Sequence, residues 1–554
     1  MKKLNIEFDV PVPMRDGTVL MANIYSPASE GPFPVLVERT PYGKNSQMAA
    51  GFDIIDAARE GYIVVRQDTR GSLASEGEWI PWKHERDDGY DTVEWAAALP
   101  NSSGKVGMFG GSYMGSTQWS SAIAQAPHLA ALAPMITWAD PENGLMFRGG
   151  AIELGFNAYW CLATALNHLP KVYPPDEALA KTGVAFGHFA ALKERLWELP
   201  SAAQPYLLEV GMPDIGVARA LEDRSTTENC RVEGRYDEIN VPSLNFAGWY
   251  DVFQQGTLDN YIAMRARGVA TRLIVGPWMH TSTLPLVSGG EVGEVNFGPL
   301  SLAPGGETIS KIHFDWYDHW LKGSPATRSH ESGVLIFVMG ANEWRAEPDW
   351  PLARARQTPL YLAPDSSLSW QAPEEGDSES TYTYDPANPV ITRGGNLVMS
   401  SDYPAGPFDQ REAEGREDVL VFTTEPLKRD TEITGRISAT IFAATDGPST
   451  DWVVRLCEVD SRGVSRNIVD GISRVHTEPG RVDEVNIDLW STSILIKAGH
   501  CLRVHVTSSN FPRWDRNLNT GEMETEGTAI RVARQRVRHD RRHPSRIELP
   551  IISD

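Results

Sequence analysis

The chain has 554 residues, 41% of them hydrophobic, and a formal net charge of −22 at pH 7. A chain of this length is too long for one ordinary core and should divide into about two to four units. The negative charge argues against binding to nucleic acid or to an anionic membrane, because both attract basic surfaces.

No apolar run approaches the length of a membrane span, and acidic residues interrupt residues 1–9 before an apolar segment forms, so we expect no signal peptide. The basic run at residues 531–546 is interleaved with apolar residues and is interpreted as the solvated face of a strand. The four cysteines are far apart and lack C-x-x-C spacing, which argues against a disulfide framework and a zinc site. These features predict a cytoplasmic protein.

The first third of the chain alternates strands and helices. Residues 7–40 read as β structure, and the apolar run 34–39 predicts a buried parallel strand that ends just before Tyr42, where open α/β sheets place their ligands. A second strand is expected at residues 62–68 and a helix at 87–99, and this alternation predicts a parallel sheet with crossover helices.

Asp68 ends the second of these strands, and Arg70 follows it. They could be catalytic, but we interpret them as a buried ion pair that holds a loop.

The stretch Gly104–Trp119 is a glycine-bounded apolar run followed by residues that can start a helix. Ser112 therefore lies in a sharp strand-to-helix turn, as in a nucleophile elbow. The first glycine of the G-x-S-x-G pattern is present at Gly110, but the second comes one residue late, at Gly115. The alternative is a glycine-rich turn with an incidental serine.

The remaining elements complete the domain prediction. A strand is expected at residues 129–138, helices near 156–169, 176–199 and 216–222, strands at 241–251 and 272–280, and a helix at 313–322; beyond these, short alternating runs indicate all-β structure. We predict an α/β-hydrolase fold with a helical cap insertion and a C-terminal all-β jelly-roll domain. The predicted parts are residues 1–139 (hydrolase domain, first part), 140–237 (helical cap), 238–345 (hydrolase domain, second part) and 346–554 (jelly roll).

A serine hydroxyl needs a base that a carboxylate orients, and in α/β hydrolases the chain order is serine, acid, histidine. Asp251 ends the stretch Gly-Trp-Tyr-Asp, and His280 follows Gly-Pro-Trp-Met. Of the 13 histidines, His280 is the one that lies just beyond a predicted buried strand, in the right order and after the right acid.

These motifs resemble those of the cocaine esterase-like serine hydrolases, which are grouped with the X-Pro dipeptidyl peptidases and the α-amino-acid ester hydrolases. In that group the late glycine and the tyrosine after the serine are usual. The resemblance implies a triad of Ser112, Asp251 and His280. The backbone N–H of Tyr113 would be one oxyanion donor, and the resemblance implies the hydroxyl of Tyr42 as the other.

The resemblance also bears on the substrate. It implies that Trp160 and Phe253 line an acyl pocket, although either could equally belong to the core. The α-amino-acid ester hydrolases have an acidic pair shortly after the catalytic aspartate, whereas this chain has Phe253 and Gln254 there. X-Pro dipeptidyl peptidases usually have an additional amino-terminal helical domain, whereas this chain starts its sheet almost at once. Both differences favour a plain small-molecule carboxylic ester over a charged aminoacyl or dipeptidyl substrate. The pocket that the resemblance implies favours an apolar or aromatic acyl group.

Other functions remain open. The same triad could serve an X-Pro dipeptidyl peptidase, an amidase or an acylase. The all-β domain could be a carbohydrate- or partner-binding module, but we favour a structural role, in which it packs against the hydrolase domain and helps close the site or an oligomer interface. The triad mechanism needs no cofactor and no metal ion, so we expect none. The sequence leaves open whether the chain forms a homo-oligomer, and it does not name the natural acyl and alcohol groups.

Overall fold

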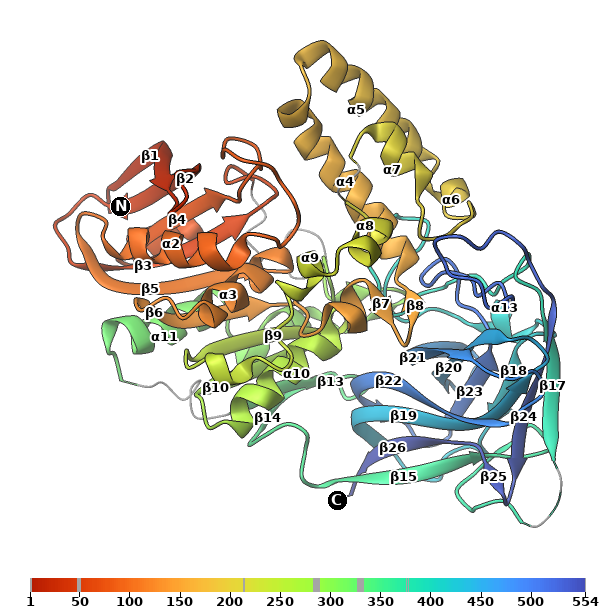
Figure 1. Ribbon diagram of the computed structural model, residues 1–554. Coiled ribbons are helices and arrows are strands. Elements are labelled where there is room, and N and C mark those ends of the chain that lie inside the picture. Colours follow the sequence, from red (N-terminus) through yellow and green to blue (C-terminus); the bar gives the residue numbers. More distant parts are fainter. Residues whose placement is uncertain are drawn as a thin grey trace.

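The structure is a computed structural model that describes residues 2–46, 51–212, 215–281, 289–325, 333–374, 376 and 378–553. An α/β part (red to green) and an antiparallel all-β part (cyan to blue) lie side by side, and a group of helices (yellow) stands above their junction (Figure 1). The prediction of an α/β fold followed by a C-terminal all-β domain is confirmed.

The α/β part is built on one sheet, which in the described chain has ten strands in the order β1-β2-β4-β3-β5-β6-β9-β10-β13-β14. The strands from β4 to β13 run parallel, and β1, β2 and β14 are antiparallel to their neighbours. The bounds are β1 Leu4–Pro13, β2 Val19–Pro27, β3 Phe33–Thr40, β4 Ile63–Asp68, β5 Ser102–Gly111, β6 Leu129–Met135, β9 Ser243–Tyr250, β10 Thr271–Met279, β13 Val334–Val338 and β14 Glu343–Glu347.

Helices cover both faces of this sheet, which explains why its inner strands read as continuous apolar runs. Val35 and Val37 of β3 pack in one core with residues of α2 and α3, whereas Leu36 packs in another with residues of α11, because neighbouring side chains of a strand point to opposite faces. The helices around the sheet are α1 Ile54–Arg59, α2 Glu85–Ala97, α3 Tyr113–Ile123, α10 Gln254–Ala266 and α11 Ile309–Lys322.

The helices above the junction lie between β6 and β9 in the sequence. They are α4 Leu154–Val172, α5 Pro175–Ala190, α6 Leu192–Arg195, α7 Pro205–Val210, α8 Val217–Glu222 and α9 Ser225–Glu228. The expected continuous helix at residues 176–199 is broken, because Ala191 leaves the helical range with ψ 19°. A short hairpin, β7 Phe147–Arg148 and β8 Ala151–Ile152, precedes α4 and was not predicted.

The all-β part consists of two antiparallel sheets. Their strand orders are β16-β15-β26-β19-β24-β17, with β22 beside β19 and β25 beside β24, and β18-β23-β20-β21. The bounds are β15 Ala355–Leu362, β16 Leu368–Ser369, β17 Glu379–Tyr384, β18 Leu420–Thr423, β19 Thr431–Thr445, β20 Ser449–Val459, β21 Ser465–His476, β22 Asp483–Ile496, β23 Cys501–Thr507, β24 Ala533–Asp540, β25 His543–Pro544 and β26 Arg546–Ile552; a short helix, α13 Arg411–Glu414, precedes β18.

The two parts share a hydrophobic core. Trp249 of β9 and Val338 of β13 belong to the same buried cluster as Leu489 and Ile494 of β22. The all-β part is therefore packed directly against the α/β part through a continuous buried core, and is not joined to it by a linker alone. The four cysteines are free thiols, and Cys501 alone among them is not fully buried.

Asp68 and Arg70 both form ion pairs, but not with each other. Asp68 is in register with Thr40 at the end of β3, so its carboxylate reaches the loop after β3 and binds the Lys44 ammonium at 3.1 Å. Arg70 lies beyond the strand end and reaches α2, where it binds the Asp88 carboxylate at 2.6 Å. The prediction that Asp68 and Arg70 form an ion pair with each other was therefore wrong.

Candidate active site

Ser112 lies in the turn between β5 and α3, with φ 58° and ψ −123°. Residues other than glycine rarely adopt such backbone angles, and the neighbouring structure must hold them in place. Gly110 has φ 120°, and a Cβ atom there would lie 2.6 Å from Cβ of Met114. A Cβ atom on Gly115 would lie 2.8 Å from Cβ of Thr137. The late glycine thus lets α3 approach the chain that follows β6.

Asp251 and His280 follow the carboxyl ends of the adjacent parallel strands β9 and β10. His280 Nδ1 lies 2.6 Å from Oδ2 of Asp251. The Asp251 carboxylate is fully buried, and its other oxygen accepts the backbone N–H of Phe253 at 2.7 Å. With an ionised Asp251 as acceptor, the imidazole proton belongs on Nδ1, which leaves Nε2 free to accept a proton.

Tyr42 lies just beyond β3, and the side chain of Ser112 lies near its hydroxyl. The Tyr42 oxygen also accepts the indole N–H of Trp160 at 2.9 Å. Burial raises the pKa of Tyr42 to about 12. The phenol is therefore neutral at physiological pH and keeps its own proton for donation.

Tyr113 is the first residue of α3, and its ring is 1% exposed. Its hydroxyl donates to Oε1 of Glu85 at 2.9 Å and accepts the backbone N–H of Trp82 at 2.9 Å. Its ring also stacks on Trp82, with centroids 5.9 Å apart. The residue after the nucleophile candidate is thus held by its side chain.

The surroundings of this group are mainly aromatic. Phe253 is 1% exposed, and its ring edge meets His280 with centroids 5.4 Å apart. Phe253 also packs on Trp138 at 5.0 Å. Trp160, on α4, stacks on Trp82 with centroids 5.6 Å apart. Both residues that the resemblance assigns to the acyl pocket thus lie in one apolar cluster with the residues around Ser112.

The all-β part also contributes to this region, which the sequence analysis missed. Asn396 donates from Nδ2 to the carbonyl oxygens of Trp249 at 2.8 Å and Asp251 at 3.3 Å. Val398 packs against the aromatic cluster. Neither residue lies in a motif that marks it, since each comes from an irregular segment more than a hundred positions after Asp251.

Within the described ranges, no group of three or more His, Cys, Asp or Glu side chains is arranged to hold a metal ion. Nor does any helix described here have the length and apolar character needed to cross a membrane. The chemistry that the arrangement offers is that of a serine beside a hydroxyl donor, together with a histidine held by a buried carboxylate.

Comparison with known proteins agrees with this chemistry. Residues 16–282 match the family model of X-Pro dipeptidyl-peptidase (S15 family), and residues 328–548 match the X-Pro dipeptidyl-peptidase C-terminal non-catalytic domain. The chain is 34% identical to the cocaine esterase of Rhodococcus sp. (strain MB1 Bresler), over 99% of each protein.

Several solved structures are similar over nearly the whole chain, and two of them serve as examples. An aminopeptidase from the marine sediment archaeon Thaumarchaeota archaeon has a TM-score of 0.82 at 25% identity, covering 100% of this chain and 97% of that one. A selenomethionine-labelled α-amino acid ester hydrolase has a TM-score of 0.78 at 25% identity, covering 99% of this chain and 97% of that one. The chain therefore belongs to the cocaine esterase-like serine hydrolases of the X-Pro dipeptidyl-peptidase (S15) family, and it is an esterase.

Proposed function

We propose that this esterase hydrolyses small carboxylic esters with an apolar or aromatic acyl group, through an acyl-enzyme on Ser112. The observation that carries the proposal is the 2.6 Å contact between His280 and the buried Asp251. These residues follow β9 and β10, which lie in the same parallel sheet as β5, the strand that precedes Ser112. This is the pairing that a general base requires to hold one tautomer and to bear a positive charge in the transition state.

The first half-reaction forms the acyl-enzyme. Oγ of Ser112 attacks the ester carbonyl carbon while Nε2 of His280 takes the hydroxyl proton, and Asp251 stabilises the resulting imidazolium. The tetrahedral oxyanion accepts hydrogen bonds from the N–H of Tyr113 and the hydroxyl of Tyr42. When this intermediate collapses, the C–O bond to the alcohol breaks and His280 protonates the leaving oxygen. A water molecule then repeats the steps on the acyl-enzyme and releases the acid.

The hydrogen bond from Trp160 supports the role of Tyr42. A phenol has one proton to donate, and an oxygen that already accepts from an indole is free to point that proton elsewhere. In the absence of substrate Ser112 lies next to this hydroxyl. An ester carbonyl bound at Ser112 would therefore lie close to Tyr42 as well.

The aromatic cluster supports an apolar acyl group. Phe253 and Trp138 present rings beside His280, and aromatic pockets favour flat apolar groups through area and edge-to-face contacts. The position after Phe253 does not supply a carboxylate for a substrate ammonium: Gln254 is buried and bonds the backbone carbonyl of Ser491 in the all-β part. This arrangement favours an uncharged ester over an aminoacyl or dipeptidyl substrate.

The experiment compares the parent protein with Ser112→Ala and Asp251→Asn on nitrophenyl acetate, nitrophenyl benzoate and an Xaa-Pro nitroanilide. We expect turnover of both esters and little cleavage of the anilide. Ser112→Ala should lower kcat by about 10⁶-fold, and Asp251→Asn by about 10⁴-fold. Ser116→Ala, a change of another buried serine on α3, is the matched control and should leave kcat within about twofold.

Either of two results would contradict the proposal. Anilide cleavage as efficient as ester cleavage would assign the chain to peptide substrates. Ester turnover that survives in Ser112→Ala would remove Ser112 as the nucleophile, and the mechanism with it.

A further inference from the structure

The Tyr113 side chain is fixed more firmly than its position on the helix requires. Its hydroxyl donates to Glu85 and accepts from the backbone of Trp82, both at 2.9 Å. Burial first, and then the charge of Glu85, raise the pKa of Tyr113 well above its ordinary value. The phenol therefore stays neutral and keeps the proton that it donates to Glu85.

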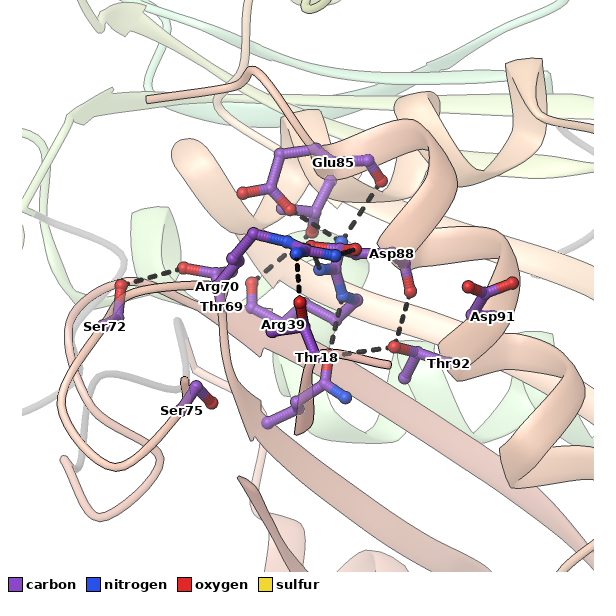
Figure 2. A network of polar contacts seen from close by, with 12 residues as sticks. Thr18, Arg39, Thr69, Arg70, Ser72, Ser75, Glu85, Asp88, Asp91 and Thr92 are labelled. Carbon is purple, nitrogen blue, oxygen red and sulfur yellow. Dashed lines mark hydrogen bonds and ion pairs between the residues drawn. The ribbon is translucent and has the colours of Figure 1, made fainter. Parts of the chain in front are cut away.

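Glu85 is itself held by a cation. Its second carboxylate oxygen, Oε2, lies 2.6 Å from Nη1 of Arg39, and both side chains are nearly inaccessible to solvent. Arg39 Nη1 also donates to the backbone carbonyl of Glu85 at 3.2 Å. Figure 2 shows Arg39 below Glu85, with Asp88 and Arg70 beside them. A buried carboxylate needs such a partner, because desolvation of an unpaired charge is costly.

Arg39 connects this pair to the other side of the site. It belongs to β3 and precedes Tyr42 by three positions. Its Nε donates to Oε1 of Gln67 on β4 at 2.8 Å, and its backbone carbonyl accepts from the Thr117 hydroxyl on α3 at 3.4 Å. One buried arginine thus joins β3, β4, α2 and α3 around the proposed oxyanion hole.

The backbone at Ser112 explains why such a brace is needed. Strained φ/ψ angles persist only where surrounding contacts over-determine them, and Tyr113 is the next residue. An oxyanion-hole donor must lie about 2.7–3.1 Å from the developing charge, and a displacement of about 1 Å can cost about 100-fold in rate. The side chain of Tyr113 holds the backbone N–H that would have to meet this requirement.

We propose that Glu85, neutralised by Arg39, is a positioning residue for ester hydrolysis. It fixes the Tyr113 ring and thereby the direction of the Tyr113 N–H toward the oxyanion. This role rests on the proposed function of Ser112 and Tyr113. It assigns a purpose to a buried ion pair that does not touch the substrate.

The test uses Glu85→Gln and Tyr113→Phe in the full chain. Glu85→Gln removes the charge that Arg39 neutralises, and the amide cannot present an acceptor to both Arg39 and Tyr113. Tyr113→Phe removes only the hydroxyl and keeps the backbone N–H. We expect each change to lower kcat on nitrophenyl benzoate by about 10- to 100-fold. The KM should stay within about twofold, because ground-state binding is unchanged.

Two further measurements separate positioning from a general loss of structure. Inhibition by phenylboronic acid, which forms a tetrahedral adduct with a reactive serine, should weaken by the same factor as kcat/KM falls. In the double variant Glu85→Gln/Tyr113→Phe, kcat should be no lower than in Tyr113→Phe alone, because both changes break one connection.

The matched control is Asp451→Asn. Asp451 is also a buried carboxylate paired with an arginine, Arg474, at 2.8 Å, but it lies on β20 in the all-β part, and its hydrogen bonds in the described structure go to Arg474 and Asn517. It should lower the Tm as Glu85→Gln does, yet keep kcat within about twofold. If Glu85→Gln lowers the Tm and leaves kcat within twofold, the ion pair is only structural and the proposal fails. Activity retained in Ser112→Ala would instead overturn the proposed function.

Discussion

Trp160 makes a hydrogen bond that the sequence did not indicate. The resemblance assigns it to the acyl pocket, whereas its indole N–H donates to the Tyr42 hydroxyl at 2.9 Å. Trp160→Phe keeps an aromatic ring on α4 and removes this donor. If Trp160 orients Tyr42, the change should slow the chemical step for every ester, whatever the size of its acyl group.

The expected magnitude follows from the bond that is lost. A neutral hydrogen bond contributes about 0.5–1.5 kcal/mol, so kcat should fall by about 2- to 13-fold. Tyr42→Phe removes an oxyanion donor itself and should lower kcat by about 10²- to 10³-fold. The double variant should be no slower than Tyr42→Phe, because Trp160 then has no hydroxyl left to orient.

The assay measures kcat and KM for nitrophenyl acetate and nitrophenyl benzoate. Trp79→Phe is the matched control: Trp79 lies next to Trp160, with centroids 6.0 Å apart, and its buried indole N–H makes no hydrogen bond in the described structure. It should leave kcat within about twofold. A KM for the benzoate that rises in Trp160→Phe while kcat for the acetate is unchanged would refute the orienting role and return Trp160 to the pocket wall.

Three further predictions concern pH and packing. Because burial raises the pKa of Tyr42 to about 12, about 1% of this phenol is ionised at pH 10, so kcat should show no loss from pH 8 to pH 10; a titration centred near pH 10 that disappears in Tyr42→Phe would contradict this. Gly115→Ala places a Cβ atom 2.8 Å from that of Thr137, so it should cost about 1–3 kcal/mol of unfolding free energy and lower kcat; an unchanged Tm would show that α3 can shift freely. Partial burial first, and then the charge of Asp140, raise the pKa of Glu233, although much of this residue is exposed. Its ionisation therefore destabilises the fold as pH rises from the unfolded pKa of about 4.3 through the raised folded value. Glu233→Gln should accordingly raise the Tm at pH 8, with the gain shrinking toward pH 4, and an equal gain at both pH values would exclude this cause.

Much of the α/β part could be predicted from local patterns. The runs at residues 34–39 and 62–68 became β3 and β4 because a strand buried on both faces is apolar along much of its length. The helix expected at residues 313–322 lies within α11, which begins four residues earlier, after the side-chain cap supplied by Thr308. By contrast, the break after Ala190 has no Gly or Pro to mark it, so a continuous helix was expected there.

The candidate site divides in the same way. Ser112, Asp251 and His280 could be proposed from the sequence because each lies at the end of a predicted strand and belongs to a recognisable motif. Their order along the chain is also the order found in α/β hydrolases. The pairing of Asp251 with His280 depends on β9 and β10 being neighbours in the sheet, which their sequence order suggests but does not ensure.

By itself, the sequence determined most strands and helices of the α/β part, where the glycine-dependent turn lies, and which family of hydrolases the motifs resemble. Only the tertiary structure decided what holds those motifs in place: Trp160 on Tyr42, Glu85 between Arg39 and Tyr113, and Asn396 on the backbone around Asp251. The physical reason is that periodicity and turn chemistry act over a few residues. A buried hydrogen bond or ion pair instead joins side chains that can be a hundred positions apart, and packing of whole elements brings them within 3 Å or so of each other.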